Sequence, residues 1–321
     1  MEARCSPVDR QPHARSEGSE PSSRARATIP IAASKLLMKI LIPVFLLFAF
    51  AVAQTPTARP PSTPEDENAR KARTLIDQSI QALGGQAFLT YKEKSEEGRF
   101  YSFFHGQSNS AGTPYGRHTE YPDKDRLEIM HMKSYFFLWF TVGNVPAKGK
   151  NDIVVIHNGD KGYEITYKGT AAEDPTVTTA YLRRRQHSLE WVYRKWINEP
   201  GVAFFQEGTA VAAGKPADQV SIVTAKNDSV TLFLDSTTHL PIKLSYSWRD
   251  PSDKLRNVED EVYDNYKPVQ DIMTPHSITR YLNDEMSFQR FMNTVSYNQS
   301  VPDSLFDASV TYDPKQAPQK R

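Results

Sequence analysis

The sequence of 321 residues has one cysteine, Cys5, and almost no net charge, with 39 basic against 38 acidic side chains. One cysteine excludes a disulfide framework and every multi-cysteine metal site. The balanced charge lacks the basic excess that nucleic-acid binding needs, so we expect no nucleic-acid partner. The hydrophobic fraction of 39% is enough for a sizeable core and argues against wholesale disorder.

Short catalytic signatures are also missing from the sequence. It contains no H-E-x-x-H, G-x-S-x-G, P-loop or G-x-G-x-x-G motif. The histidines occur singly, and the carboxylates at 250–253 and 259–261 lack the glycine turn of a calcium loop. We therefore predict no catalytic residues, no metal and no cofactor, and we expect that the protein is not an enzyme.

The N-terminal region changes character at Met38. Residues 1–37 are polar and rich in Arg, Ser and Pro, and we interpret them as a disordered upstream extension that precedes the true start at Met38. Residues 38–53 have the positive start, apolar run and small-residue end of a cleavable signal peptide. A membrane-spanning helix is the alternative, but the apolar run is shorter than the about 20 residues that a bilayer requires.

Cleavage after Ala53 would leave Gln54 at the N-terminus and would remove the single cysteine, so none would remain to carry a lipid. We therefore expect a periplasmic or secreted protein without a lipid anchor. Residues 54–64 form a Pro/Thr linker, residues 65–307 are expected to form one domain, and residues 308–321 are expected to be a disordered tail.

Two helices are predicted. The first begins at Pro64, has acidic residues in its first turn and ends at Gly84-Gly85. The second runs from Asp174-Pro175 to Pro200-Gly201. Their apolar stripes consist of Ala72, Leu75, Ile76, Ser79, Ile80 and Leu83 in the first, and of Leu182, Leu189, Val192 and Trp196 in the second.

From Tyr91 onward the apolar residues alternate with a period of two, which indicates about ten strands. Short links between them favour antiparallel meander pairing. With only two helices, such a sheet must curl over them or close on itself, and a sheet wrapped around helices encloses an apolar cavity. The predicted strands are Gly98–Phe104, Arg126–Met132, Asp152–His157, Gly162–Lys168, Gln219–Ala225, Ser229–Asp235, Leu240–Trp248, Val258–Tyr266, His276–Leu282 and Phe288–Tyr297.

Two segments have both a structural and a functional interpretation. The most apolar one, Ser134–Val145, is either a doubly buried core strand or an apolar lip at the mouth of a cavity. The basic run Arg183, Arg184 and Arg185 on the second helix is either a solvated face or a site that steers the protein toward anionic headgroups. Such steering contributes about 1 kcal/mol per basic residue near a membrane.

Several turn motifs occur along the predicted domain. They are Leu83-Gly84-Gly85, Asn158–Tyr163, Leu240-Pro241-Ile242, Tyr263–Tyr266 before Met273–His276, and Tyr297-Asn298 before Val301–Phe306. Together with the export signal and the meander, these motifs resemble the outer-membrane lipoprotein-sorting superfamily of LolA/LolB-like carriers, over residues 65–306. This chain is longer than the founding carriers are expected to be, and it offers no short signature for cargo contact.

The resemblance implies a mainly β (α+β) fold, in which a strongly curved antiparallel sheet forms an unclosed β-barrel with about two helices plugging or lidding its mouth. It also implies a periplasmic, non-enzymatic carrier whose partner is a lipid or a lipidated protein, with a transfer partner in the inner or outer membrane as an option. The candidate cavity residues, each of which could equally be plain core, are Leu189, Val192, Trp196, Leu232, Leu234, Ile242, Leu244, Tyr246 and Trp248.

Two other classes stay open. An envelope scaffold would fill the barrel with its own side chains and bind partners at exposed strand edges. An exported hydrolase would assemble its site from scattered residues. An apolar cavity would favour the carrier over the scaffold, and a cleft with converging titratable groups would favour the enzyme.

Overall fold

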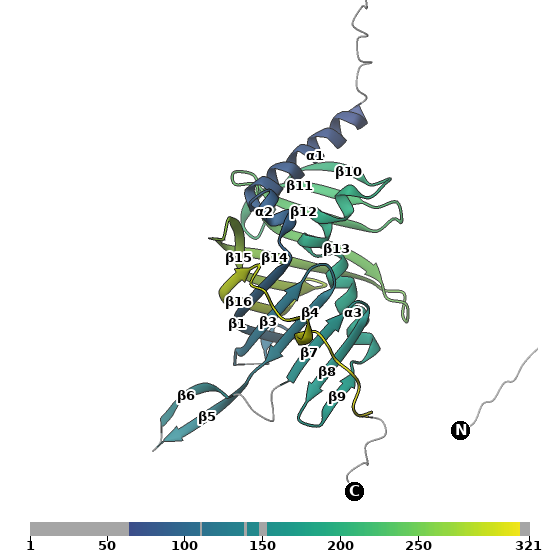
Figure 1. The fold of residues 1–321 in the computed structure, drawn as a ribbon. Helices are drawn as coiled ribbons and strands as arrows, with labels where there is room; N and C mark the ends of the chain where they lie inside the picture. Colours follow the sequence, from purple (N-terminus) through teal and green to yellow (C-terminus); the bar gives the residue numbers. More distant parts are fainter. Residues whose placement is uncertain (1–63, 110, 138–139, 148–152, 315–321) are drawn as a thin grey trace, which may run out of the picture. The chain divides into compact units, whose positions relative to one another are not determined.

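The computed structural model describes residues 64–109, 111–137, 140–147 and 153–314, which belong to one compact unit (Figure 1). The predicted upstream extension, the signal peptide and all but the last residue of the predicted linker lie outside the described residues. Within the described part, the first helix, α1 (Pro64–Leu83), is confirmed. Its stripe is buried at Ala72, Ile76, Ser79, Ile80 and Leu83, while Leu75 is half-buried.

The end of α1 follows from its two glycines. Gly84 and Gly85 adopt φ angles of 120° and 56°, a region that glycine enters without steric cost. A methyl group at Gly84 would overlap the carbonyl oxygen of Asp271, so the position also allows a close approach to the turn before β15. A short helix, α2 (Gln86–Thr90), follows directly.

Fourteen of the strands form one antiparallel sheet, which is open because β10 and β9 lie at its two ends (Figure 1). The strand order is β10-β11-β12-β13-β14-β15-β16-β1-β3-β4-β7-β8-β9, and β2 pairs with β1. Nearly all neighbours are joined by short connections, but β1 also pairs with β16, at the other end of the sequence. The predicted open, antiparallel and mainly β fold with few helices is confirmed.

The strands of the large sheet are more numerous than the sequence indicates, and the additional ones are β2, β3, β9 and β10. β3 and β10 in particular lack a clear apolar alternation. The strands of the large sheet are β1 (Glu93–Phe104), β2 (Gln107–Ser108), β3 (Thr113–Glu120), β4 (Lys124–Ile129), β7 (Ile153–Asn158), β8 (Lys161–Thr166), β9 (Gly169–Ala172), β10 (Ala203–Ala212), β11 (Lys215–Val223), β12 (Ser229–Asp235), β13 (Pro241–Arg249), β14 (Arg256–Val269), β15 (Ile272–Leu282) and β16 (Glu285–Tyr297).

The second predicted helix is broken into α3 (Pro175–Gln186), α4 (Leu189–Arg194) and the 3-10 turn η1 (Trp196–Asn198). Asp174 caps α3 as predicted, by accepting a hydrogen bond from the Thr176 amide at 2.8 Å. The break falls at His187, whose ring stacks on Tyr246 with 4.1 Å between centroids. Ser188 then caps α4 by accepting from the Trp191 amide at 3.3 Å. The capping serine inside the run is what turns one helix into two.

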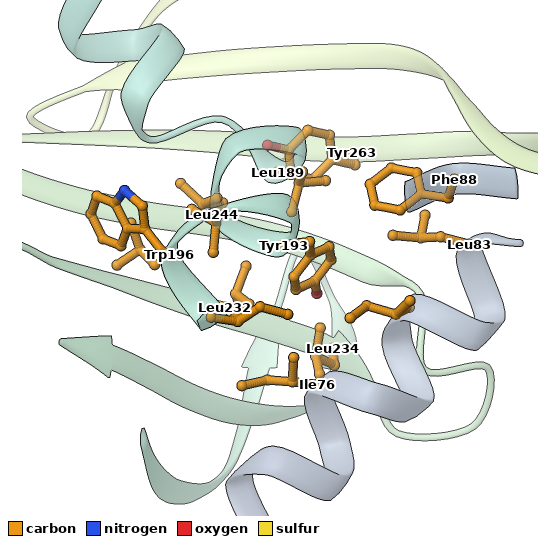
Figure 2. Close-up of a cluster of buried hydrophobic side chains, with 14 of the residues drawn as sticks. Ile76, Leu83, Phe88, Leu189, Tyr193, Trp196, Leu232, Leu234, Leu244 and Tyr263 are labelled. Carbon is orange, nitrogen blue, oxygen red and sulfur yellow. The ribbon is translucent and has the colours of Figure 1, made fainter. Parts of the chain in front are cut away.

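The main core lies where α1, α2, α4 and η1 pack on the strands from β11 to β15 (Figure 2). Figure 2 shows Ile76 and Leu83 of α1, and Tyr193 and Trp196 of the α4–η1 segment, directed toward the side chains of β12 and β13. One polar contact lies inside this apolar layer, a buried hydrogen bond of 2.8 Å between the hydroxyls of Ser79 and Tyr193. The helices therefore fill this half of the sheet themselves.

Ile242 departs from the regular alternation predicted for its strand. The pairing of β12 with β13 shifts between Phe233 and Leu234, so that Leu234 pairs with Pro241 and Phe233 with Lys243. This bulge turns Ile242 out of the main core and into a small cluster with Ala212 and Ala217. A bulge changes which face a residue occupies without a clear signal in the hydrophobic pattern.

The apolar segment Ser134–Val145 forms a hairpin, so the interpretation as one core strand is wrong. β5 (His131–Phe137) and β6 (Phe140–Ala147) pair with each other in a separate two-stranded sheet, with His131 opposite Ala147. Figure 1 shows this hairpin extending away from the large sheet. The alternative interpretation, an apolar lip, stays a prediction.

The chain end lies against the sheet in its described part. After the 3-10 turn η2 (Asp303–Leu305), Phe306 is buried, and Arg126 of β4 donates a hydrogen bond of 2.9 Å to the Leu305 carbonyl. Further on, the Thr311 amide donates to the Thr170 carbonyl of β9 at 2.8 Å. Residues 308–314 of the predicted disordered tail therefore include a segment bonded to the edge strand; residues 315–321 lie outside the described part.

Candidate functional site

A cavity of about 480 Å³ lies on the inner face of the other half of the sheet. Its floor is formed by strands β14, β15, β16, β1, β3, β4 and β7, and α3 and α4 cover it. This volume is in the range of pockets that hold small molecules, about 300–1,000 Å³. A second hollow of about 520 Å³ lies elsewhere, between the β7–β8 turn and residues 306–309, and eight residues line it.

One part of the cavity wall is apolar. It continues the main core, because Leu83, Phe88, Leu189, Ile272 and Ile278 belong to both. The remaining apolar members come from strands and from α3. They are Phe100, Leu127, Val155, Val177, Met273 and Phe288.

The floor carries a row of charged side chains that crosses the sheet from strand to strand. Each of seven neighbouring strands contributes at least one ionisable residue to the lining, so these groups lie on adjacent strands. From Glu261 to Asp125, acidic and basic members alternate except where Arg280 and Arg290 are neighbours. In strand order from β14 to β7, the members of this charged row are Glu261, Arg280, Arg290, Glu96, Arg117, Asp125 and His157.

Glu96 is the centre of the charged row and is 4% exposed. Its carboxylate lies 3.0 Å from Arg290 Nη1 and 2.9 Å from Lys94 Nζ, and it accepts from the Tyr115 hydroxyl at 3.2 Å. Burial alone would raise the pKa of the Glu96 carboxyl, but Arg290, Lys94 and Arg117 together lower it well below its usual range. Glu96 is therefore a fixed negative charge.

The β7 end of the charged row is centred on His157. Its Nε2 lies 2.9 Å from Glu173, and its ring stacks on Tyr181 with 3.5 Å between centroids. Asp125, which Arg117 contacts through Nε at 2.6 Å, lies 4.0 Å from the Nδ1 of His157. Burial lowers the pKa of the imidazole, and the two carboxylates oppose this shift. The arrangement fits a neutral histidine held in place by its neighbours.

The β14 end has looser ion pairs. Arg280 contacts Glu261 and Glu259 only at 3.5 Å each. Burial raises the pKa of Glu259, and the neighbouring Glu261 adds to this shift, while Arg280 and Arg184 oppose it. Burial would raise the pKa of Glu261 too, but Arg280 and Arg290 lower it. Arg184 of α3 faces the same part of the cavity.

Only one of the nine apolar residues predicted for the cavity, Leu189, lines it. Seven of the other eight lie in the main core or pack against it, and Ile242 lies in the small cluster with Ala212. The residues in the main core are apolar because they pack against the protein's own helices and strands. A ligand role for them stays a prediction. The core residues of this set are Val192, Trp196, Leu232, Leu234, Leu244, Tyr246 and Trp248.

The three arginines of α3 are all half-buried and do not form an exposed basic face. Arg183 lies over the Trp248 ring, with 3.8 Å from its guanidinium carbon to the ring centroid. Arg185 donates to the carbonyls of Gly159 at 2.7 Å and Asp123 at 3.2 Å. Steering toward a membrane stays a prediction for these residues.

The charged row was missed by reasoning from the sequence, although a weak signal is present. On β3 and β16 a charged residue occurs in phase with buried or half-buried large residues, as in Tyr115-x-Arg117 and Phe288-x-Arg290-x-Met292. A single charge at such a position is also compatible with an outward-facing strand. Only the pairing of β1 with β16, which joins distant parts of the chain, brings the row together.

For the described residues, no group of three or more His, Cys, Asp or Glu side chains is arranged to hold a metal ion. No helix in this part of the chain combines the length and the apolar character needed to cross a membrane.

Comparison with solved structures finds similar folds in bacterial proteins. A domain of an outer membrane lipoprotein-sorting protein from Vibrio parahaemolyticus is 11% identical, with a TM-score of 0.48, covering 75% of this chain and 97% of that one. A DUF1329 family protein from Desulfovibrio piger is 12% identical, with a TM-score of 0.46, covering 74% and 97%. A LolA superfamily protein from Nitrosomonas europaea is 8% identical, with a TM-score of 0.42, covering 74% and 97%. No family model and no curated protein sequence matches the chain.

Two of these solved structures carry the description of the superfamily that the sequence resembles, lipoprotein sorting and LolA. The similarity between this chain and these solved structures is a similarity of fold.

Proposed function

We propose that this protein is a non-enzymatic binding protein or carrier of the cell envelope, which holds an amphipathic molecule in the cavity. The ligand would be a lipid or an acyl chain of a lipidated protein. The observation that carries this proposal is that apolar side chains and the charged row line the same cavity. An amphipathic molecule has both kinds of surface, so each of its parts would meet lining of matching polarity.

The apolar wall supplies the driving force in this proposal. Burying a hydrocarbon chain against Leu127, Val155 and Phe288 would contribute about 0.8 kcal/mol per methylene. The cavity volume of about 480 Å³ suits a ligand of small-molecule size, so one acyl chain is a closer match than a bulky lipidated protein. Residues of the main core would serve as a rigid support behind the wall.

The charged row supports a binding role over an acid–base role. General acids and bases are most effective when their pKa lies near the working pH. Against the effect of burial, Arg290 and Lys94 lower the pKa of the Glu96 carboxyl, and Arg280 and Arg290 lower that of the Glu261 carboxyl. Both carboxylates would therefore stay ionised at neutral pH and act as fixed charges.

Export to the periplasm is part of the proposal and rests on the signal-peptide pattern of residues 38–53. N-terminal sequencing of protein secreted from cells that express the full chain is the direct test. Gln54 as the first residue would support export with cleavage after Ala53. A product that starts upstream of Met38 would contradict it.

The test of the cavity uses a matched pair of variants on β7. Val155 lines the cavity, whereas its half-buried neighbour Val154 is not part of the lining and has the opposite orientation on the strand. Val155→Trp should fill the cavity and weaken the binding of a fluorescent fatty-acid analogue at least about tenfold. Val154→Trp should bind like the unmodified protein.

Thermal unfolding of both variants is the control for folding, and Leu127→Phe is a milder cavity-filling change if Val155→Trp does not fold. Equal binding by the unmodified protein and every cavity-filled variant that folds would contradict the cavity as the site. No binding by the unmodified protein would contradict the carrier. Co-purification of an envelope protein in that case would favour the scaffold, and turnover of an ester substrate would favour the hydrolase.

A further inference from the structure

Arg184 differs from the two arginines beside it. Arg183 lies against a tryptophan ring, and Arg185, which also lines the cavity, donates to backbone carbonyls, whereas Arg184 lines the cavity without such contacts. Within the described residues, Arg184 forms no ion pair and no side-chain hydrogen bond. Burial lowers the pKa of Arg184, and the charge of Arg280 lowers it further. Glu259 and Glu261 oppose this shift, but neither lies within ion-pair distance. An arginine stays protonated at neutral pH despite such a shift, so the cavity holds a positive charge that no carboxylate contacts directly.

Arg280 is the second cation at this end of the cavity. Its contacts with Glu261 and Glu259 are both 3.5 Å long, and its buried Nε atom makes no hydrogen bond with any described group. Two arginines thus line the cavity with longer contacts to carboxylates, or none within ion-pair distance, than the other arginines of the charged row have.

A buried charge without a good partner costs free energy, and a bound anion can remove that cost. Guanidinium groups suit carboxylate and phosphate oxygens because their planar donors match the spacing of two oxygens. Apolar side chains lie next to this pair. The Arg280 guanidinium carbon is 4.9 Å from the centroid of the Phe288 ring, and Ile278 comes two residues earlier on β15. An anion bound here would have an apolar wall beside it.

We propose that Arg184 and Arg280 bind the anionic headgroup, a carboxylate or a phosphate, of an amphipathic ligand whose chain lies along the apolar wall. This inference rests on the proposed binding function and specifies the chemistry of the ligand. It assigns Arg184 as the residue that distinguishes an anionic ligand from an uncharged ligand of the same chain length.

The test compares two ligands and two variants of the full chain. Palmitate and monopalmitoylglycerol carry the same acyl chain, but only palmitate is anionic. Arg184→Met should weaken palmitate binding about tenfold or more, because a charge-assisted hydrogen bond is lost, and should leave monopalmitoylglycerol binding within about twofold. Arg183→Met removes the same charge one residue away, outside the cavity lining, and should change neither affinity.

A readout of stability separates this role from a structural one. Without ligand, Arg184→Met should unfold at a higher temperature than the unmodified protein, because a poorly compensated charge is replaced by an apolar side chain of similar length. Lysophosphatidate should raise the unfolding temperature of the unmodified protein more than that of Arg184→Met. Inorganic phosphate alone should give a much smaller shift, since it lacks the chain.

The possible failures can be told apart. If the unmodified protein binds neither palmitate nor monopalmitoylglycerol, both the binding function and the headgroup site are wrong. If Arg184→Met binds palmitate as well as the unmodified protein does, the headgroup site is wrong and the binding function stands. A phosphate shift as large as that of lysophosphatidate would overturn the amphipathic ligand in favour of a free anion. A lower unfolding temperature for ligand-free Arg184→Met would make Arg184 a structural residue.

Discussion

At Glu96, three donors from three strands meet one buried carboxylate. Lys94 lies on the same strand, Tyr115 comes from β3 and Arg290 from β16. Each partner would be left with an unsatisfied group in a buried position if the carboxylate were lost. Because these three strands lie at the middle of the cavity floor, the ion pairs of Glu96 also connect the two ends of the chain.

Glu96→Gln tests this position directly. Removing the charge leaves Arg290 and Lys94 without their partner and should reduce the free energy of unfolding by about 3 kcal/mol at neutral pH. Glu97→Gln, at the next residue, changes an exposed side chain and should stay within about 0.5 kcal/mol. Urea unfolding of the three proteins measures both effects. Equal effects of the two substitutions would contradict the role of Glu96.

The effect of Glu96→Gln on stability should depend on pH, in a direction that the pKa of Glu96 determines. The pKa of Glu96 is lowered on folding from its ordinary value of 4.5, because Arg290 and Lys94 outweigh burial. Its contribution is therefore fully present above pH 4.5 and is lost as the pH falls below that value, by about 1.4 kcal/mol per pH unit. The stability difference between the unmodified protein and Glu96→Gln should shrink below pH 4.5.

Single residues of the site were poorly predictable from the sequence. Leu189 was found because it lies on a helical stripe, and that stripe also points toward the cavity. Arg184 was noted as part of a basic run, but its difference from Arg183 and Arg185 depends on what each guanidinium meets in the folded protein. A charged residue whose partner comes from a distant strand has no local signature.

Among the elements, α1 was predicted in full because its stripe, acidic first turn and glycine end are all local features. The break between α3 and α4 was missed. Ser188 offers a capping hydroxyl in the middle of a helical pattern, and the stacking of His187 on Tyr246 of β13 favours the turn. The capping serine was visible in the sequence, but the stacking of the two rings depends on the tertiary fold.

The pairing of β1 with β16 contains a bulge that can be tested with two glycines. The register shifts between Glu97 and Gly98, and a methyl group at Gly98 would overlap the Phe291 carbonyl oxygen of β16. Gly98→Ala should therefore destabilise the protein by about 2 kcal/mol, since backbone must move to make room. Gly116 pairs with Glu97 on the opposite strand and has only an ordinary contact of 3.8 Å with Met130.

Gly116→Ala is the matched control and should leave the stability unchanged or raise it by about 0.5 kcal/mol, because alanine restricts the unfolded chain. Guanidinium unfolding of both variants gives the comparison. A large loss in Gly116→Ala with no loss in Gly98→Ala would contradict the close approach of β1 and β16.

At the scale of the molecule, the two halves of the sheet differ in what lies against them. Helices α1 and α4 fill the half from β11 to β13 with apolar side chains, while the half from β14 to β7 carries the cavity and its charged row. The sequence indicated the open antiparallel sheet, because strands with short links pair with their neighbours. Of the predicted cavity residues, all but Leu189 lie outside the lining of the cavity described above, because the most apolar strands are those that the protein's own helices cover.

The most direct test of the account is native mass spectrometry of the protein after expression of the full chain and purification from the periplasm without detergent. We expect an adduct whose mass matches a lipid or fatty acid with an anionic headgroup, and we expect Val155→Trp, prepared in the same way, to lack it. A clean mass for the unmodified protein, unchanged after incubation with envelope lipids, would contradict the account.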